Sequence, residues 1–228
     1  MKWGDVLIIG DSFCSARSEF WHWPQIFTSE LTGEEFKNSN TIRGKGFNGA
    51  SWWSSRKLTL RELKRSIPKI AVFFHTEPLR LPHDQDWGIN YRSVELKTVH
   101  QTDVADIPMS EDFAQAGRLY YEQLISLEFH EWAVHQWFLE LDSLISPIEK
   151  VIHVYCFDGK YTSYTFQQGV TLAYPMINYQ QKTPIFKKNN EPEANHFTPQ
   201  INKKFALALV EIIKNYPGNG ARIESAIL

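Results

Sequence analysis

Short runs of consecutive apolar residues recur along the chain, and stretches with helical spacing of apolar positions lie between them. Four aliphatic residues stand together at 6–9, and comparable runs occupy 70–74 and 151–157. Such runs are typical of strands that are buried on both faces, as in a parallel sheet. Shorter runs at 38–42 and within 169–179 predict two further strands, so we expect about five.

Apolar residues at steps of three and four predict amphipathic helices between these strands. Pro24 suits the first turn of the first helix, Gly33 suits its end, and Pro68 marks the end of the second. The expected helices cover 15–31, 54–67, about 110–147 and the later part of 195–216. Strands that alternate with helices predict an α/β fold with a mainly parallel sheet.

The length of 228 residues suits a single domain that covers 1–228. Periodicity is poor over 81–109, where polar residues and prolines are common, and a long helical stretch follows. We therefore expect a loop and helical insertion around 81–146. Long excursions of this kind are often functional.

The segment Gly10-Asp11-Ser12 follows the first predicted strand directly. Glycine permits a tight turn, and aspartate followed by serine can hold that turn or cap a helix. Open α/β sheets bind ligands beyond the carboxyl ends of their strands, which makes Ser12 a candidate nucleophile. An ordinary strand-to-helix turn explains the same residues, so the motif needs support from elsewhere in the chain.

A second motif, Glu193-Ala194-Asn195-His196, lies just before the last predicted helix. A carboxylate three residues ahead of a histidine lets one turn present both side chains together. The carboxylate can accept a hydrogen bond from one ring nitrogen while the other nitrogen faces Ser12. This is the logic of a serine–histidine–acid triad, which is recognised by the roles of its members rather than by their positions.

Together these segments resemble the motif blocks of the SGNH, or GDSL-type, hydrolase family, and they occur in the order of that family. Gly10–Phe13 is similar to the first block, Asn48–Ser51 to the second, and Glu193–His196 to the last. The resemblance extends from the first strand to the last helix. It implies a three-layer α/β/α sandwich of the flavodoxin-like type, with a five-stranded parallel sheet.

The same resemblance implies the roles of individual residues. Ser12 would be the nucleophile, and its amide and that of Gly49 would donate hydrogen bonds to the oxyanion. His196 would be the general base. Glu193 stands where the family usually has aspartate, and this longer acid can also orient an imidazole ring.

The third block of the family departs from the pattern in this chain. The family has glycine, any residue, asparagine and aspartate after the third strand, whereas this chain has His75-Thr76-Glu77-Pro78. Glu77 thus replaces an asparagine that would donate to the oxyanion, and an ionised carboxylate has no proton to donate. Arg80, oriented by Glu77, is the first candidate for a replacement donor, and Asn48 is the second. A purely structural ion pair between Glu77 and Arg80 is an equally open alternative.

Eight tryptophans are present, and four lie close in sequence to the proposed catalytic motifs: Trp21, Trp23, Trp52 and Trp53. Packing in the core is the expectation for each, and stacking on a sugar is the minority alternative. Trp52 is our candidate for such a substrate contact, together with Asp11 and Glu77.

His130 and His135 superficially resemble a zinc-protease motif, but they are five residues apart. Side chains at that spacing diverge by about 140° on a helix and cannot share a metal ion on one face. We expect no metal and no cofactor.

Composition narrows the expected partners and location. The net charge of −2 argues against binding through nucleic-acid phosphates, and no apolar run is long enough to span a bilayer. The start of the chain does not read as a signal peptide. Cys14 and Cys156 imply no disulfide framework, and buried thiols are expected for both. Synthesis in the cytoplasm fits these features, and later incorporation into a phage particle is compatible with them.

The sequence therefore predicts a serine esterase that hydrolyses a short-chain acyl ester, such as an O-acetyl group, of a small molecule or carbohydrate. Two other functions stay open. One is a catalytically weak or inactive glycan-binding module of a larger assembly, which Glu77 favours. The other is transfer of an acyl group to a sugar instead of water.

Overall fold

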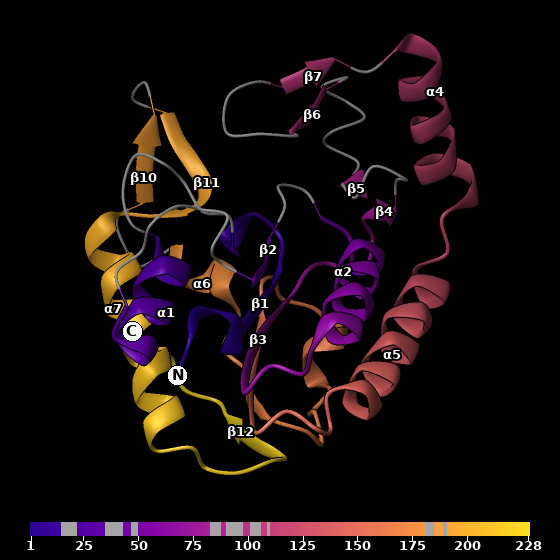
Figure 1. The fold of residues 1–228 in the computed structure, drawn as a ribbon. Helices are drawn as coiled ribbons and strands as arrows, with labels where there is room; N and C mark the ends of the chain where they lie inside the picture. The colour runs from indigo at the N-terminus through magenta and orange to yellow at the C-terminus, as the bar shows by residue number, and fades with distance from the viewer. Residues whose placement is uncertain are drawn as a thin grey trace.

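The computed structural model describes residues 1–14, 22–34, 43–46, 50–82, 88–89, 98–100, 106–108, 110–180, 185–188 and 191–228. Within these ranges strands and helices alternate along the chain, and Figure 1 shows the strands in the middle with helices on both sides. The strands of the main sheet are β1 (Val6–Gly10), β2 (Arg43–Gly46), β3 (Ile70–His75), β8 (Lys150–Tyr155), β9 (Val170–Leu172) and β12 (Ala221–Ile223). The helices are α1 (Trp23–Thr32), α2 (Trp52–Arg65), α4 (Glu111–Leu119), α5 (Leu127–Leu144), α6 (Met176–Gln180) and α7 (Pro199–Lys214).

Six strands form the main sheet in the order β12-β9-β8-β3-β1-β2, and all neighbouring strands run parallel. The predicted α/β fold with a mainly parallel sheet is confirmed, with one strand more than the five expected. The chain passes from β1 to the edge strand β2 and then crosses to β3 on the other side of β1. This reversal is a topological switch point, and such sheets bind ligands in the crevice beyond it.

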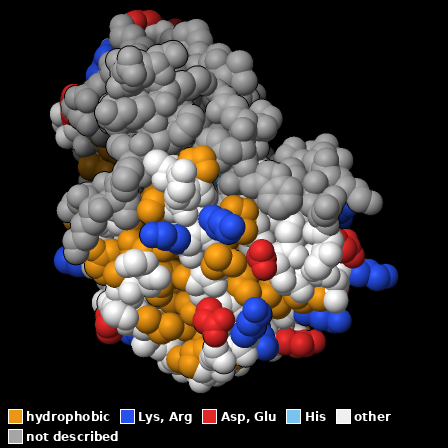
Figure 2. All heavy atoms as spheres, turned by 90° about the vertical axis from the view of Figure 1, so that its left-hand side faces the viewer, with side chains coloured by type: hydrophobic (Ala, Val, Ile, Leu, Met, Phe, Trp, Pro, Cys, Tyr) orange, Lys and Arg blue, Asp and Glu red, His pale blue; other side chains and the backbone are white. Residues whose placement is uncertain are grey.

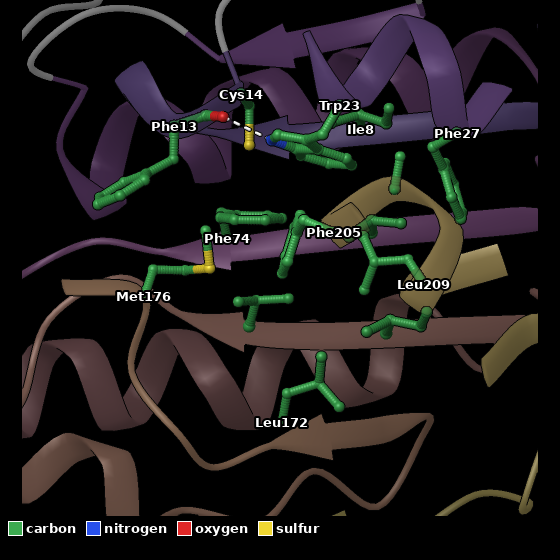
Figure 3. Close-up of a cluster of buried hydrophobic side chains, with 14 of the residues drawn as sticks. Ile8, Phe13, Cys14, Trp23, Phe27, Phe74, Leu172, Met176, Phe205 and Leu209 are labelled. Carbon is green, nitrogen blue, oxygen red and sulfur yellow. Dashed lines mark hydrogen bonds between the residues drawn. The ribbon is translucent and has the colours of Figure 1, made fainter. Parts of the chain in front are cut away.

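Successive residues of the central strands enter different cores, because side chains alternate between the two faces of a strand. Ile8 of β1 packs with α1 and α7 on one face, whereas Leu7 packs with α2 and α5 on the other. Figure 3 shows the first core, in which the ring of Trp23 stacks on Phe74 at 4.8 Å and meets Phe205 edge-on at 5.6 Å. Burial on both faces explains why these strands are apolar at most positions, with His75 of β3 and His153 of β8 as buried polar residues.

The edge strand β2 differs from its prediction. A strand was expected at 38–42 and a glycine-rich loop from Gly44 onward, but β2 is Arg43–Gly46. Gly44 has a φ of +81°, and a Cβ atom there would lie 2.3 Å from the carbonyl oxygen of Ile8. Glycine is therefore what lets β2 pair closely with β1, and this strand needs no apolar run. Residues 35–42 and 47–49 lie outside the described ranges.

The first two helices agree with the local signals that predicted them. Pro24 lies in the first turn of α1, and Gly33 ends the helix in the left-handed conformation with a φ of 70°. α2 begins two residues earlier than expected, because the Ser51 hydroxyl caps it by accepting a hydrogen bond from the Ser54 amide. α2 ends at Arg65, before Pro68. Of the helix predicted over 15–31, residues 15–21 lie outside the described ranges.

The last helix begins later than a start at Asn195 would place it. Thr198 caps α7 with its hydroxyl, and Pro199 is the first helical residue. The residues before them form β11 (Glu191–Phe197), which pairs antiparallel with β10 (Ile185–Lys188). The predicted acid–histidine motif thus lies in a strand of a separate two-stranded hairpin.

The described residues of the region predicted as an insertion form two short antiparallel pairs and two α-helices. β4 (Leu81–Pro82) pairs with β5 (Gly88–Ile89), and β6 (Thr98–His100) pairs with β7 (Asp106–Pro108). α4 continues through a single π-helical turn, η4 (Tyr120–Leu124), and α5 follows. Val134, Phe138 and Leu141 of α5 are buried against the sheet, so this helix belongs to the core of the fold.

Figure 2 shows the face of the molecule over α1 and α7, where a broken strip of hydrophobic side chains is interrupted by charged ones. Leu207 and Leu228 are among the exposed hydrophobic residues. No helix in the described ranges combines the length and apolar character needed to cross a bilayer.

Candidate functional site

The candidate site begins where β1 ends at the switch point of the sheet. Gly10 is packed so closely that a Cβ atom would lie 2.6 Å from both the Cys14 Sγ and the Phe74 Cβ atoms. Ser12 opens a 3₁₀ turn, η2 (Ser12–Cys14). The sequence prediction that Ser12 lies just beyond the carboxyl end of a central parallel strand is confirmed.

Three hydrogen bonds fix the backbone of the turn that carries Ser12. The Phe13 amide donates to the Asp11 carboxylate at 3.1 Å, and the Cys14 amide donates to the Asp11 carbonyl at 2.9 Å. The indole Nε1–H of Trp23 donates to the Phe13 carbonyl at 2.6 Å, as Figure 3 shows. Because the partners come from the turn itself and from α1, the position of Ser12 is strongly constrained.

Asp11 is completely buried and forms the centre of a charged network. Arg80 Nη1 lies 3.4 Å from Asp11 Oδ2 and 3.3 Å from the Ala50 carbonyl oxygen, and Arg80 Nε donates to Glu77 at 3.1 Å. The Cys156 thiol donates to Asp11 Oδ1 at 3.6 Å. Since solvent does not reach the Asp11 carboxylate, this residue can position the site but a ligand at the surface cannot touch it.

The ion pair expected between Glu77 and Arg80 is present, and Arg80 also joins β1 to β3 through Asp11. Burial raises the pKa of Asp11, and the attraction of Arg80 opposes this rise. Burial alone would lower the pKa of Arg80, but the attraction of Asp11 and Glu77 raises it above its ordinary value. Arg80 therefore stays a cation beside the turn, and its Nη2 has no hydrogen-bond partner among the described residues.

The hairpin that contains Glu193 and His196 lies beside this turn. Cα atoms of β11 and η2 come within 8 Å of one another, and β11 also contacts α6 and α7. Figure 1 shows β10 and β11 standing above the start of α7. The two ends of the polypeptide that the sequence analysis linked are therefore neighbours in the fold.

β11 is irregular at the motif itself. Ile185 pairs with Phe197 and Lys187 pairs with Pro192, so five residue steps in β11 face two in β10. The four residues 193–196 thus face the single residue 186 of β10, and this segment, which contains Glu193 and His196, forms a bulge. The expectation that one turn presents this acid and this histidine is thus replaced by a bulged strand, a form that frequently lies next to functional sites.

A chain of buried hydrogen bonds connects the two segments. The Trp23 side chain donates to the Phe13 carbonyl, and the Trp23 amide donates to Asn202 Oδ1 at 3.2 Å. Asn202 Nδ2 in turn donates to the Phe197 carbonyl at 2.9 Å. Phe13 directly follows Ser12 and Phe197 directly follows His196, so the backbones at both predicted catalytic residues are tied to one asparagine.

The remaining predicted site residues are distributed as follows. Asn48 and Gly49 lie outside the described residues. Trp52 begins α2 next to the Ala50 carbonyl that Arg80 contacts, and its ring meets Trp53 edge-on at 5.6 Å. Within the described part of the chain, the buried Trp52 Nε1 has no hydrogen-bond partner. Trp23 is a core residue and is 1% exposed.

A buried histidine pair beside the site has no signature in the sequence. His75 Nε2 lies 3.0 Å from His153 Nδ1, and His153 Nε2 lies 2.9 Å from the Gln168 carbonyl oxygen. A carbonyl only accepts hydrogen bonds, so His153 carries its proton on Nε2. The unprotonated Nδ1 of His153 then accepts a hydrogen bond from the Nε2–H of His75. Burial lowers the pKa of His153 to about 3 and lowers the pKa of His75 well below its ordinary value. Both rings are therefore neutral at pH 7 and stack on Phe166.

His130 and His135 both lie on α5 and have separate surroundings. His130 Nε2 lies 2.6 Å from the Tyr120 hydroxyl, whereas the His135 ring meets Tyr164 edge-on at 5.3 Å. Over the described ranges, no three His, Cys, Asp or Glu side chains are grouped as metal ligands would be.

No family model, curated protein or solved structure matches the chain. The basis for a functional proposal is therefore the local geometry of the site. It consists of a constrained serine turn, a buried charged network and an adjacent bulged strand with an acid and a histidine.

Proposed function

We propose that the chain is a serine ester hydrolase with Ser12 as nucleophile, His196 as general base and Glu193 as the acid that orients the base. The observation that carries this proposal is the hydrogen-bond chain through Trp23 and Asn202, which ties the residues after Ser12 and His196 together. Buried hydrogen-bond networks whose members are all satisfied rigidify the segments that they join. This chain of hydrogen bonds therefore favours a fixed arrangement of the backbones next to Ser12 and His196.

In the proposed reaction His196 removes the hydroxyl proton of Ser12, and the oxygen attacks the ester carbonyl. The tetrahedral intermediate collapses to an acyl-serine when His196 gives the proton to the leaving alcohol. Water then attacks the acyl group with His196 again as base, which releases the acid and restores Ser12. Glu193 accepts a hydrogen bond from the other ring nitrogen of His196 and keeps the imidazole in the required tautomer.

The oxyanion is stabilised in this proposal by backbone amides and by Arg80. The Ser12 amide is the first of a helical turn, so the turn itself gives it no acceptor. The Gly49 amide is the second proposed donor, and Arg80 Nη2 is the third. Asn48 is the alternative third donor. Loss of one oxyanion donor typically slows turnover by about 100- to 1,000-fold, so a replacement for the missing asparagine matters.

Hydrolysis of p-nitrophenyl acetate tests the proposal. Ser12→Ala should lower turnover by at least about 10⁴-fold, because the nucleophile is lost. Ser143→Ala, which changes an exposed serine at the end of α5, serves as the matched control and should leave turnover unchanged. Equal activity in wild type and Ser12→Ala would refute the esterase proposal.

A second candidate function is a catalytically weak glycan-binding module of a larger assembly. The observation that favours it is the network in which Arg80 is already paired with both Asp11 and Glu77. Two carboxylates beside the guanidinium reduce the positive potential that an oxyanion would feel. In that case p-nitrophenyl acetate would not be turned over, although the fold and the network would be unchanged.

A further inference from the structure

A pocket of about 510 Å³ lies between α5 and the segment after β8. Its volume is within the range of small-molecule sites in proteins. α5 and the 3₁₀ turn η5 (Lys160–Ser163) provide its two sides. The described residues that line it include Glu131, His135, Lys160, Tyr161, Ser163 and Tyr164.

The aromatic walls of the pocket are held in place from behind. The Tyr164 hydroxyl donates to Asp142 at 2.8 Å, and Asp142 also accepts hydrogen bonds from the amides of residues 167 and 168. The Tyr161 hydroxyl donates to the Phe157 carbonyl at 2.7 Å. Tyr161 is buried, with 8% of its surface exposed, so the half-buried Tyr164 offers the larger aromatic surface to a ligand. Because both hydroxyls are bound to the protein, the pocket needs little rearrangement to accept a ligand.

Glu131 and Lys160 are oppositely charged residues of the described pocket lining. Glu131 and Lys160 form an ion pair with 3.7 Å between Oε2 and Nζ, and the Lys160 side chain is 81% exposed. His135, one turn after Glu131, adds a ring that can both donate and accept hydrogen bonds. Among the described residues that line the pocket, Lys160 is the single Lys or Arg and already faces Glu131, so this lining is poorly suited to a phosphate or another anion.

These features point to a ligand with apolar faces and with hydroxyl groups around its edge. A pyranose ring has C–H faces that pack on aromatic rings, and its hydroxyls can donate to Glu131 and accept from Lys160 or His135. We propose that this pocket binds a neutral carbohydrate of two or three sugar units through stacking on Tyr164 and hydrogen bonds to Glu131.

The location of the pocket gives the proposal a functional context. η5 follows the carboxyl end of β8, which is two strands from β1 and so about 10 Å away across the sheet. The pocket and the serine turn therefore share one edge of the sheet. Carbohydrate binding here does not depend on ester hydrolysis at Ser12, and it can be tested whether or not that reaction occurs.

Saturation-transfer NMR and calorimetry with the Ser12→Ala variant test the proposal without interference from hydrolysis. The probes are trisaccharides of glucose, N-acetylglucosamine, mannose and galactose, with adenosine as a planar aromatic competitor. At least one trisaccharide should bind, and Glu131→Gln should weaken that binding about tenfold or more. Glu128→Gln, an exposed acid one turn earlier on α5, should leave it unchanged.

A second variant guards against an indirect effect of Glu131. Ser163 is exposed at the pocket, and Ser163→Trp should abolish saccharide binding by filling the space. The proposal is overturned if no trisaccharide binds, if adenosine binds in their place, or if binding persists unchanged in both Glu131→Gln and Ser163→Trp. Because the assay detects binding alone, its failure would leave the outcome of the p-nitrophenyl acetate test unaffected.

Discussion

The two halves of the proposed catalytic site are built in different ways. The serine half stands at the end of a central strand of a six-stranded sheet, and a buried carboxylate and a buried tryptophan hold its turn. The histidine half stands in the bulged strand of a two-stranded hairpin. Two-stranded hairpins are marginally stable on their own, so the histidine half depends on what it packs against.

This difference separates stability from activity. The serine half shares its contacts with the core, so damage to it should destabilise the whole fold. The histidine half is attached through Phe197, which is 3% exposed, and through the side chain of Asn202. Damage there should move His196 relative to Ser12 and should reduce turnover more than stability.

The largest effect on stability is expected for Asp11→Ala. The substitution leaves the buried Arg80 guanidinium without one of its two carboxylate partners, at a cost of about 3 kcal/mol in the free energy of unfolding. Urea denaturation would measure this loss. Asp158→Ala removes an exposed aspartate and is the matched control, for which a change within about 0.5 kcal/mol is expected. A loss below 1 kcal/mol for Asp11→Ala would show that the network does not hold the serine half together.

A smaller loss of stability with a distinct loss of activity is expected for Asn202→Ala. The Trp23 amide and the Phe197 carbonyl would both lose their partner, which costs about 2 kcal/mol. Displacement of the hairpin by about 1 Å would lower turnover of p-nitrophenyl acetate by about 100-fold. Asn215→Ala, at the exposed end of the same helix, is the control. Unchanged turnover in Asn202→Ala would mean that this asparagine does not position His196.

The smallest effect, when counted per pH unit, is a dependence of stability on pH that arises beside the serine half. The folded state holds His153 with a pKa of about 3, whereas an unfolded histidine has a pKa of about 6.5. The contribution of neutral His153 to the free energy of unfolding is fully present above pH 6.5. It is lost as the pH falls toward 3, because His153 then binds a proton in the unfolded state but not in the folded state. The loss should approach about 1.4 kcal/mol per pH unit below pH 6.

Urea denaturation at pH 7, 6 and 5 would reveal this slope in the wild type. The His153→Asn variant is the comparison, and its slope should be shallower by the contribution of one histidine. Parallel slopes for the two proteins would indicate that His153 is protonated in the folded state.

The sequence predicts β1, β3 and β8 well, because burial on both faces of a strand requires a mostly apolar run of residues, and such a run is visible in the sequence. β2 is different, since Arg43–Gly46 contains no apolar side chain and pairs with β1 through the freedom of Gly44. β11 is also not recognisable, because a proline and several polar residues occupy it and its partner strand sets its conformation. Local periodicity carries no information on either of these strands.

The candidate site is predictable only as far as its motifs are contiguous. Gly10-Asp11-Ser12 is read from one short segment, and its place at the end of a strand follows from the pattern. The contact between Asp11 and Arg80 spans 69 residues, and the contact between Trp23 and Asn202 spans 179. Contacts of this range depend on the strand order, which the sequence alone does not define.

The central claim is that Ser12 and His196 share a proton, and labelling with a serine-reactive fluorophosphonate tests it most directly. In the wild type, mass spectrometry should locate the phosphonyl adduct on Ser12. His196→Gln should slow the labelling by at least about 100-fold while urea denaturation shows an unchanged free energy of unfolding. The absence of an adduct on Ser12 in the wild type, or equal labelling rates in wild type and His196→Gln, would contradict the claim.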